Sequence, residues 1–252
     1  MSTEERQARI LAEIDRTGGV RITNLGARLG VSDVTARRDV EALAERGLVA
    51  RVRGGAMART AVPAPARGAG LRAKTAIARS AARLVRPDEA IGILAGGITA
   101  LLARELAGVP GLSVVTNAIP IADVFHHGGR PDQMVLLLGG VRTRSGALTG
   151  PVAERAAAGL NVDVVFVAVS GMDVPSGFTA PGRPEARIGA ALIAAARRVV
   201  VLADHGAWGA AGAAVIAPLE RADVVVTDDG LVRAGRSALR GRVGRLIVAD
   251  VP

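Results

Sequence analysis

Two adjacent arginines lie near the start of a short amphipathic segment, VSDVTARRDVEALAERG, which runs from residue 31 to residue 47. Ser32 precedes the apolar pattern and is predicted as the N-cap of a helix, so Arg37 and Arg38 fall in its first turns. A helix N-terminus repels cations, so this arrangement indicates either a solvated surface or a strongly negative partner. Duplex DNA is such a partner, because arginine can bind guanine O6 and N7 together.

One side of this predicted helix is apolar. Steps of four, three and four residues align Ala36, Val40, Leu43 and Gly47. Arg38 then points away from that stripe, and Thr35 and Arg37 lie on its flanks. A DNA-reading helix buries one side and directs its first turns at base edges and phosphates, as this pattern predicts. The alternative is a solvated helix whose arginines pair with Asp33, Asp39 or Glu41.

The flanking residues predict two further helices ahead of the arginine-bearing one, within residues 1–56. The first has an apolar face of Ile10, Leu11 and Ile14 and ends at Gly18-Gly19. The second carries Leu25 and Leu29 four residues apart, with Thr23 as its cap and a stop at Gly30. A turn of about three residues then leads to the third helix.

A short strand follows these helices. Val49 and Val52 alternate with Arg51 and Arg53 before the chain breaks at Gly54-Gly55. Helix, helix, tight turn, helix and hairpin is the element order of a winged helix-turn-helix. The sequence therefore predicts a DNA-binding domain over residues 1–56.

The rest of the chain has a different pattern. Residues 57–72 are rich in Ala, Pro, Gly and Arg and predict a linker. Residues 73–252 alternate apolar strands with Ala-rich helices, which predicts a mostly parallel α/β domain. Strands are expected at 90–94, 112–116, 134–138, 162–169, 198–203, 222–227 and 245–249, and helices near 73–85, 98–107, 118–126, 151–158 and 185–196.

Glycine-rich stretches follow four of these predicted strands: AGGIT (95–99), GGVRTRSGALTG (139–150), SGMDVPSG (170–177) and DHGAWG (204–209). Glycine after a strand lets backbone amides approach an anion closely. Ligands of parallel sheets bind beyond the carboxyl ends of the strands, where such loops gather. The sequence therefore predicts one crevice at that edge, although ordinary loop chemistry is the alternative for each stretch.

The amino-acid composition restricts the class of protein and its expected location in the cell. The 252 residues include no cysteine, which excludes a disulfide framework and a thiolate site, and no apolar run approaches the ~18 residues of a membrane span. The polar N-terminus does not resemble a signal peptide, so a cytoplasmic protein is expected. Lysine occurs once among 32 basic residues, a bias typical of a bacterium with GC-rich DNA. The net charge of +9 is spread along the chain and favours nucleic-acid binding only weakly.

The stretch VSDVTARRDVEALAERGLVARVRGGA resembles, nearly position by position, the signature of DeoR-family bacterial transcription regulators. The matching positions are Val31-Ser32, Thr35, Arg37-Arg38-Asp39, Leu43, Gly47, Arg51 or Arg53, and Gly54-Gly55-Ala56. Ala36 departs from the family, which usually has a larger aliphatic residue there. The resemblance implies binding of double-stranded operator DNA through Ser32, Thr35, Arg37, Arg38, Arg51 and Arg53.

The resemblance extends to about Asp228. In the family, the second domain is similar to ribose-5-phosphate-isomerase-like folds and senses phosphorylated sugars or related metabolites. Carried over position by position, the effector-binding residues are expected to be Lys74, Gly96, Gly97, Thr99, Thr116, Asn117, Gly139, Gly140, Gly171 and Asp204.

Two loops depart from the family pattern. Ile98 replaces a threonine of the first loop, and Gly206 and Ala207 stand where the family has serine and lysine. Since these changes remove hydroxyls and a cation, we expect an effector that depends less on phosphate than the family norm. A neutral polyhydroxylated ligand against Asp204 and Trp208 fits this expectation, although Trp208 packing on the sheet is the alternative. Surface arginines could instead supply the charge: Arg142, Arg144, Arg183 or Arg187.

These observations predict a homo-oligomeric repressor, a dimer or tetramer, with no cofactor and no metal. The fold also permits a sugar-phosphate isomerase, for which Asp173, Glu185, Asp204 and His205 are the candidate acid–base groups. A third alternative is an architectural DNA binder that responds to no ligand. Neither alternative is favoured, because no spacing indicates a catalytic constellation.

Overall fold

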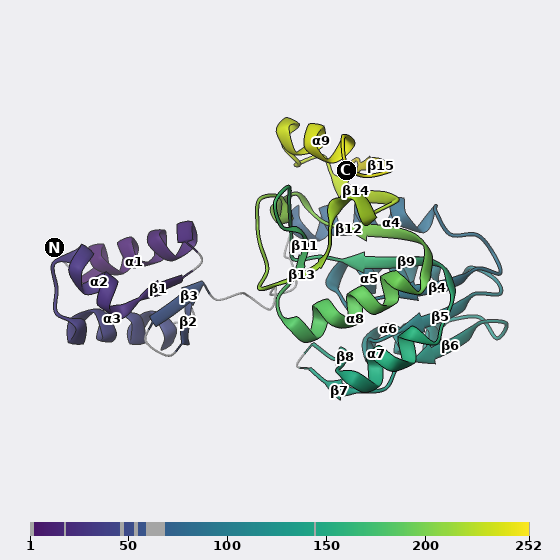
Figure 1. Ribbon diagram of the computed structural model, residues 1–252, viewed down its shortest axis with the longest axis horizontal. Helices are drawn as coiled ribbons and strands as arrows, with labels where there is room; N and C mark the ends of the chain where they lie inside the picture. The colour runs from purple at the N-terminus through teal and green to yellow at the C-terminus, as the bar shows by residue number, and fades with distance from the viewer. Residues whose placement is uncertain are drawn as a thin grey trace. The chain divides into compact units, whose positions relative to one another are not determined.

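A computed structural model describes residues 3–17, 19–45, 48–52, 55–58, 69–143 and 145–251. The chain divides into two compact units, residues 1–65 and 66–252. Figure 1 shows the helices and strands of each unit. No helix in these ranges is long and apolar enough to cross a membrane.

The first unit is a winged helix-turn-helix. Its elements are α1 (Thr3–Thr17), β1 (Gly19–Arg21), α2 (Ile22–Leu29), α3 (Asp33–Glu45), β2 (Val49–Val52) and β3 (Gly55–Ala58). The strands form an antiparallel sheet in the order β1-β3-β2. The predicted element order is thus confirmed, whereas β1, three residues between two helices, was not expected.

The apolar stripe of α3 closes the core of this unit. Ala36, Val40 and Leu43 are buried and pack with Ile10 of α1 and Leu25 of α2. The fourth predicted member of the stripe, Gly47, lies outside the described residues, as do Gly18 and Gly54. The stripe therefore fixes which side of α3 stays exposed.

The turn between α2 and α3 is three residues long, as predicted. Gly30 adopts a positive φ of 67°, and the Val31 amide donates to the Gly26 carbonyl at 3.0 Å. The Thr35 amide donates to Ser32 Oγ at 3.2 Å, which confirms Ser32 as the N-cap of α3. The prediction of Thr23 as a cap is wrong, because α2 already begins at Ile22.

The second unit contains a parallel sheet. In its described residues seven strands lie in the order β15-β14-β12-β9-β4-β5-β6, and all neighbours run parallel. Their bounds are β4 (Ala90–Ile93), β5 (Ser113–Thr116), β6 (Met134–Leu137), β9 (Val162–Ala168), β12 (Ala196–Leu202), β14 (Val224–Asp228) and β15 (Arg245–Ala249). All seven strands correspond to predicted ones, so the expected α/β class is confirmed.

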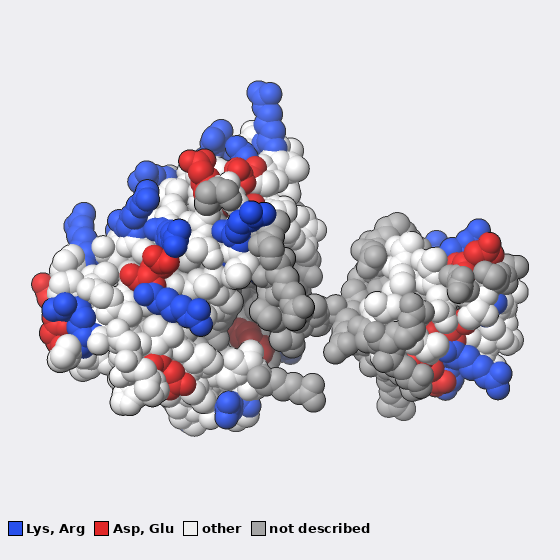
Figure 2. Space-filling view, turned by 180° about the vertical axis from the view of Figure 1, so that it is seen from behind, with Lys and Arg blue, Asp and Glu red and all other residues white. Residues whose placement is uncertain are grey.

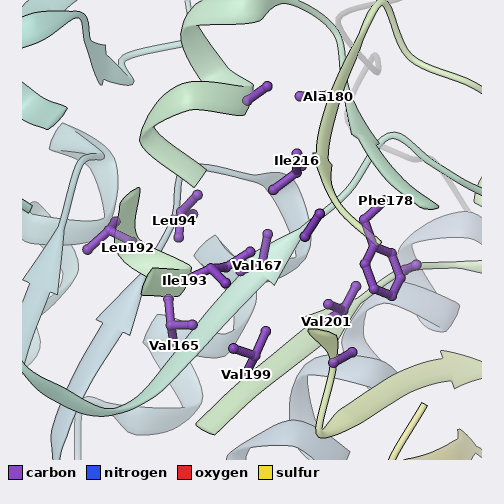
Figure 3. Close-up of a cluster of buried hydrophobic side chains, with 14 of the residues drawn as sticks. Leu94, Val165, Val167, Phe178, Ala180, Leu192, Ile193, Val199, Val201 and Ile216 are labelled. Atoms are coloured by element: carbon purple, nitrogen blue, oxygen red, sulfur yellow. The ribbon is translucent and has the colours of Figure 1, made fainter. Parts of the chain in front are cut away.

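Helices cover both faces of this sheet. Their bounds are α4 (Ala69–Ala82), α5 (Gly97–Leu106), α6 (Ile119–Gly128), α7 (Pro151–Ala158), α8 (Arg183–Ala194) and α9 (Arg233–Arg240). Side chains of α4, α5 and α6 share one buried cluster with Ile91, Phe166 and Val200 of the strands. Side chains of α7, α8 and α9 share the other cluster, part of which Figure 3 shows around Val165, Val167, Val199 and Val201.

In the described part of the second unit, two small sheets, the α-helix α9 and two short 3-10 helices, His205–Ala207 and Leu219–Arg221, were not predicted. The antiparallel sheet β10-β11-β13 consists of Gly171–Asp173, Gly177–Ala180 and Ala214–Ala217, and the hairpin β7-β8 of Val141–Arg142 and Leu148–Thr149. Helix α9 was missed because only Gly235 and Leu239 of its residues are buried, which leaves almost no apolar pattern.

The predicted linker, residues 57–72, overlaps ordered elements at both ends. Strand β3 continues to Ala58 and helix α4 begins at Ala69. Residues 59–68 lie outside the described residues.

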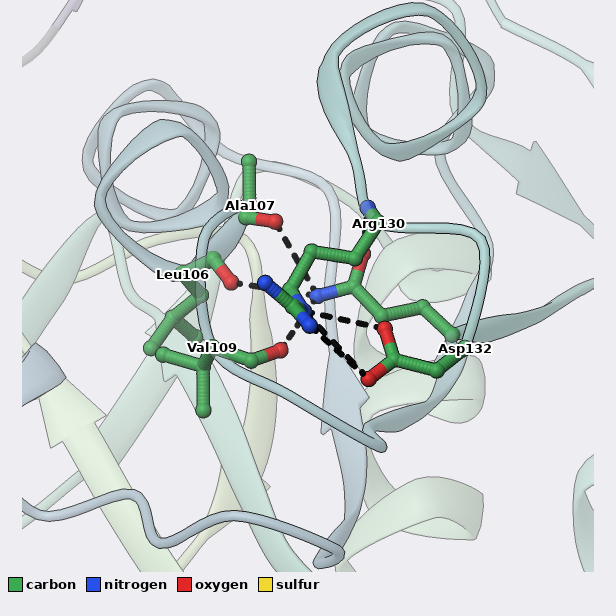
Figure 4. Close-up of polar contacts among 6 residues, drawn as sticks. Leu106, Ala107, Val109, Arg130 and Asp132 are labelled. Carbon is green, nitrogen blue, oxygen red and sulfur yellow. Dashed lines mark hydrogen bonds and ion pairs between the residues drawn. The ribbon is translucent and has the colours of Figure 1, made fainter.

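Side-chain hydrogen bonds hold the start of β6 against the chain that follows α5. Gln133 Nε2 donates to the carbonyls of Ala107 and Val109 at 3.1 and 2.6 Å. Beside it Arg130 pairs with Asp132 at 3.0 Å, as Figure 4 shows. The hydrogen bond from Arg130 lowers the pKa of the Asp132 carboxyl.

Candidate DNA interface and effector site

Arg37 and Arg38 are exposed on α3, Arg38 on the side opposite the buried stripe and Arg37 on its flank. Within the described part of the chain, neither side chain has a hydrogen-bond or ion-pair partner. Two guanidinium groups without a protein partner, on a helix fixed by its other face, are free to bind an external anion.

The third residue of the Arg-Arg-Asp run has a different environment. Asp39 is 4% exposed and accepts hydrogen bonds from Arg6 of α1 at 2.8 and 3.2 Å. The bond to Asp39 also raises the pKa of the Arg6 guanidinium. Asp39 therefore ties α3 to α1, and the alternative in which it neutralises Arg37 or Arg38 is wrong.

The remaining predicted DNA contacts lie on α3 and the wing. Ser32 is exposed and Thr35 half-buried, and their hydroxyl oxygens lie 3.0 Å apart at the start of α3. Arg51 belongs to β2. Arg53 lies outside the described residues. Base or phosphate contact by these four residues stays a prediction.

Charge on the second unit forms no single basic patch on the face seen in Figure 2. Lys and Arg side chains are interspersed with Asp and Glu over that face, and most of its area is uncharged. Several arginines are paired locally, such as Arg187 with Glu154 at 2.8 Å. Because Arg187 is engaged in this way, it is a poor substitute for the cation that the effector loops lack.

The order in which the chain adds strands to the parallel sheet reverses between β4 and β9. From β4 the chain continues to β5 and β6 on one side, and from β9 to β12, β14 and β15 on the other. In open α/β sheets a crevice forms beyond the carboxyl ends of the two strands at such a point. The loops that begin at residues 94 and 169 therefore flank the expected ligand position.

The loop after β4 packs closely on the end of β9. A Cβ added to Gly96 would lie 2.5 Å from Ala168 Cβ and 2.9 Å from Thr99 Oγ1. Thr99 is fully buried and its hydroxyl donates to the Gly96 carbonyl at 3.0 Å. Gly97 is exposed, and a Cβ there would meet no atom within 4 Å. Gly96 and Thr99 thus shape the loop, whereas Gly97 leaves its own backbone open to solvent.

The structure brings two of the predicted effector residues together. Lys74 comes from the first half of α4, and Asp204 follows β12 at the carboxyl edge of the sheet. Lys74 Nζ lies 3.6 Å from Asp204 Oδ2, and the two side chains are 19% and 29% exposed. A cation and a carboxylate, both partly accessible, therefore meet beside the strands that flank the crevice.

Thr116 ends β5 and Asn117 follows it, and both side chains are buried with their polar groups bonded inside the protein. Thr116 Oγ1 donates to the Ile93 carbonyl at 2.7 Å. Asn117 accepts from the Ala95 amide at 2.9 Å and donates to the Leu148 carbonyl at 3.1 Å. The two side chains join β4 and the loops after β4 and β5 to the β7-β8 hairpin.

The other predicted glycines lie in the loops after β6 and β9. Gly139 and Gly140 follow the edge strand β6, and Gly140 has a φ of 134° that suits the turn into β7. Gly171 begins β10, where a Cβ would overlap the carbonyl of Ala210. These positions shape neighbouring loops, and their contact with an effector stays a prediction.

The residues that depart from the family pattern are largely internal. Ile98 is 6% exposed and Ala207 is 7% exposed. Trp208 packs against the buried cluster on the α7–α9 face and lies close to Gly235 of α9. This contact favours the packing alternative for Trp208 over stacking against a ligand.

The sequence did not predict the contact between His205 and Asp228. His205 Nδ1 lies 2.6 Å from Asp228 Oδ2, which joins the loop after β12 to the last residue of the neighbouring strand β14. The signal was a polar residue at the carboxyl end of each strand, but only the strand order shows that the two ends are adjacent. Among the described residues, no group of three or more histidines and carboxylates could hold a metal ion.

Two family matches cover most of the chain. The DeoR-like helix-turn-helix domain matches residues 6–62, and the DeoR C terminal sensor domain matches residues 70–229. This chain belongs to the DeoR family. It is therefore a DNA-binding transcription regulator, as the exposed arginines of α3 indicate.

Relatives in the DeoR family match over nearly their whole length. The HTH-type transcriptional regulator GlpR of Haloferax volcanii is 32% identical, with 92% of each chain covered. The transcriptional repressor AccR of Agrobacterium fabrum is 32% identical, with 91% of each chain covered. The putative aga operon transcriptional repressor of Escherichia coli O157:H7 is 25% identical, covering 94% of this chain and 91% of the relative.

Solved structures give a weaker likeness. Ribose 5-phosphate isomerase A of Methanocaldococcus jannaschii is 16% identical and covers 54% of this chain and 53% of its own, with a TM-score of 0.39. The expected isomerase-like fold is thus among the similar structures, but a TM-score this low supports no inference about activity.

The contrast between Gly96 and Gly97 gives a testable prediction. Gly96→Ala places a methyl group against Ala168, and we expect it to destabilise the second unit by about 1–3 kcal/mol, the usual cost of overpacking. Gly97→Ala enters open space and serves as the matched control. Denaturant unfolding of both variants measures the difference, and equal stability of the two would contradict the close packing of the loop after β4 on the end of β9.

Proposed function

We propose that this DeoR-family regulator represses genes of carbohydrate or related metabolism, and that a small hydroxyl-rich effector controls its binding to operator DNA. Two of the relatives are named as repressors, one of them of the aga operon. We further propose that it acts in the cytoplasm as a dimer or tetramer, because half-site recognition needs two reading heads.

The Lys74–Asp204 pair is the observation that carries the effector site. The two side chains are held 3.6 Å apart and remain partly exposed, so a ligand can replace either partner without unfolding the loop. Lys74 belongs to α4, the first helix after the segment that leads from the DNA-binding unit. A ligand that binds one arrangement of this helix better would shift the equilibrium between DNA-binding states.

We propose that the effector is bound without being turned over. Of the candidate acid–base groups, Asp173 accepts the Ser176 amide at 2.7 Å and so stabilises the β10-β11 turn. Lys74 and Asp204 neutralise each other, which leaves no free base beside an electrophile in this pair.

A screen on the full-length protein tests this proposal. Operator DNA is first selected from random duplexes, and sugars, polyols and their phosphate esters are then examined by thermal shift. A true effector at a hundredfold excess over its Kd should add about 2.7 kcal/mol of stability and change operator affinity. Isomerisation of a hit faster than about 1 s⁻¹ would instead indicate an enzyme. DNA binding unaffected by every compound would indicate an architectural role.

Lys74 provides the matched variant. Lys74→Met should raise the Kd of the effector by roughly 10- to 100-fold, since it removes a charge-assisted hydrogen bond of about 1.5–3 kcal/mol. Operator affinity without effector should stay unchanged. Arg104→Gln, an exposed change in the last turn of α5, is the control. If both variants bind the effector as the natural protein does, the ligand lies elsewhere.

A further inference from the structure

The His205 ring is exposed yet fixed in position. Its side chain is 54% exposed, whereas Asp228 is 2% exposed. Asp228 Oδ2 lies 2.6 Å from His205 Nδ1, and Asp228 Oδ1 accepts the His205 amide at 2.6 Å. Asp228 Oδ2 also accepts the Gly230 amide at 3.2 Å. A buried carboxylate thus holds both the backbone and the ring of one exposed residue.

The neighbouring glycine makes room for this ring. A Cβ on Gly230 would lie 2.6 Å from His205 Nδ1 and 2.9 Å from Asp228 Oδ2. The imidazole therefore lies directly against the backbone of residue 230. Any larger residue there would displace the ring, so the orientation of the ring depends on residues 205, 228 and 230.

This geometry selects one tautomer. An ionised carboxylate only accepts hydrogen bonds, so His205 Nδ1 must donate to Asp228. In the neutral ring Nε2 then carries no proton and is a hydrogen-bond acceptor. Asp228 would hold the loop through the His205 amide whatever the side chain at 205. The stability of the loop therefore does not require an imidazole ring that is exposed and fixed.

The charges around the ring disfavour a dianion. His205 directly follows Asp204, which pairs with Lys74 at 3.6 Å. The loop beside the ring also carries Asp229, whose carbonyl, like that of Leu231, accepts a hydrogen bond from Arg236. The two cations of Lys74 and Arg236 are thus outnumbered by the carboxylates of Asp204, Asp228 and Asp229. A phosphate ester carries close to two negative charges near neutral pH and would be repelled by this excess. Two hydroxyl groups of one ligand, in contrast, can donate to Asp204 and to His205 Nε2 respectively.

We infer that His205 is a ligand-contacting residue of the effector site, and that its Nε2 accepts a hydrogen bond from a hydroxyl of an uncharged polyol or sugar. Asp228 is the positioning residue that fixes the ring. This inference rests on the proposed function and specifies the class of its effector.

Titration calorimetry on the full-length protein tests the contact. The probes are glycerol, ribitol, galactitol and D-ribose, each compared with a phosphate monoester. His205→Asn keeps a donor near Asp228 but removes Nε2, and we expect the Kd of the uncharged probe to rise about 3- to 10-fold, the effect of one lost hydrogen bond. His205→Gln can place an amide oxygen near the Nε2 position and should lose less. His127→Asn is the control, because that ring bonds the Asp123 carbonyl on α6.

A second measurement reports on Asp228 independently of ligand. The chain has three histidines, so the ¹⁵N imidazole signals of His205 can be assigned from their loss in His205→Gln. We expect the Nδ1–H tautomer in the natural protein and a mixture of tautomers in Asp228→Asn. A merely structural Asp228 would leave the tautomer unchanged.

The outcomes separate the inference from the proposed function. If no probe binds the natural protein, the sugar-sensing proposal and this inference both fail. If an uncharged probe binds equally well to His205→Asn, only the inference fails. A tenfold or greater preference for phosphate esters, or an Nε2–H tautomer in the natural protein, also overturns it.

Discussion

Replacing Arg37 and Arg38 together with alanine should abolish specific operator binding while the protein stays folded. Both side chains are exposed and lie outside the stripe of Ala36, Val40 and Leu43, so their removal leaves the core intact. Each arginine that contacts a base should contribute about 1–3 kcal/mol of sequence-dependent affinity. Fluorescence anisotropy with selected operator and with scrambled DNA measures both the loss and its specificity.

The control for this variant is Arg9→Ala. Arg9 is an exposed arginine of α1 that is not part of the reading helix. It should change operator affinity only as much as a distant charge does. Unchanged operator binding in the Arg37→Ala/Arg38→Ala protein would show that α3 does not read DNA.

Helical spacing predicted the exposed side of α3 because it depends on residues within one element. Three apolar positions at steps of four and three are sufficient to orient Arg37 and Arg38. The partner of Asp39 could not be predicted in this way. Arg6 is 33 residues away on another helix, and many exposed acids and bases in the chain would satisfy the same charge rule.

The strands of the parallel sheet were also predictable, since each is a local apolar run. Their order in the sheet was not, and the site depends on it. The Gly96-Gly97 and Gly139-Gly140 pairs look alike in the sequence, yet one follows a strand at the crevice and the other follows the edge strand β6. For the same reason His205 and Asp228 gave no joint signal before β12 and β14 were known to be neighbours.

Whether a side chain is buried also could not be predicted from the sequence. Thr116 and Asn117 suggested hydroxyl and amide groups for a sugar, whereas both are buried and bonded to backbone groups. Ile98 suggested an altered pocket wall, but its side chain is part of the core. Residue type alone does not distinguish a polar group that faces a ligand from one that satisfies a buried backbone.

Asp39→Ala should destabilise the DNA-binding unit by about 2 kcal/mol, even though Asp39 lies next to two residues whose removal leaves the fold intact. Asp39 is 4% exposed, and the Arg6 side chain that it bonds is 14% exposed. Removing the carboxylate removes the charge-assisted hydrogen bonds that Arg6 donates at 2.8 and 3.2 Å, a type of bond that usually contributes about 1.5–3 kcal/mol. Arg6 also bonds Thr3 Oγ1 at 3.2 Å, which places the expected value at the lower end.

Denaturant unfolding that follows both units distinguishes this effect from a loss of DNA contact. Only the transition of residues 1–65 should move, and operator binding should fall for every DNA sequence alike, unlike the loss in the Arg37→Ala/Arg38→Ala protein. The control is Arg6→Met/Asp39→Leu, because an apolar pair of similar volume often restores the stability that a broken ion pair loses. If Asp39→Ala unfolds within about 0.5 kcal/mol of the natural protein, the pair does not hold α3 on α1. The orientation of Arg37 and Arg38 would then depend on the apolar stripe alone.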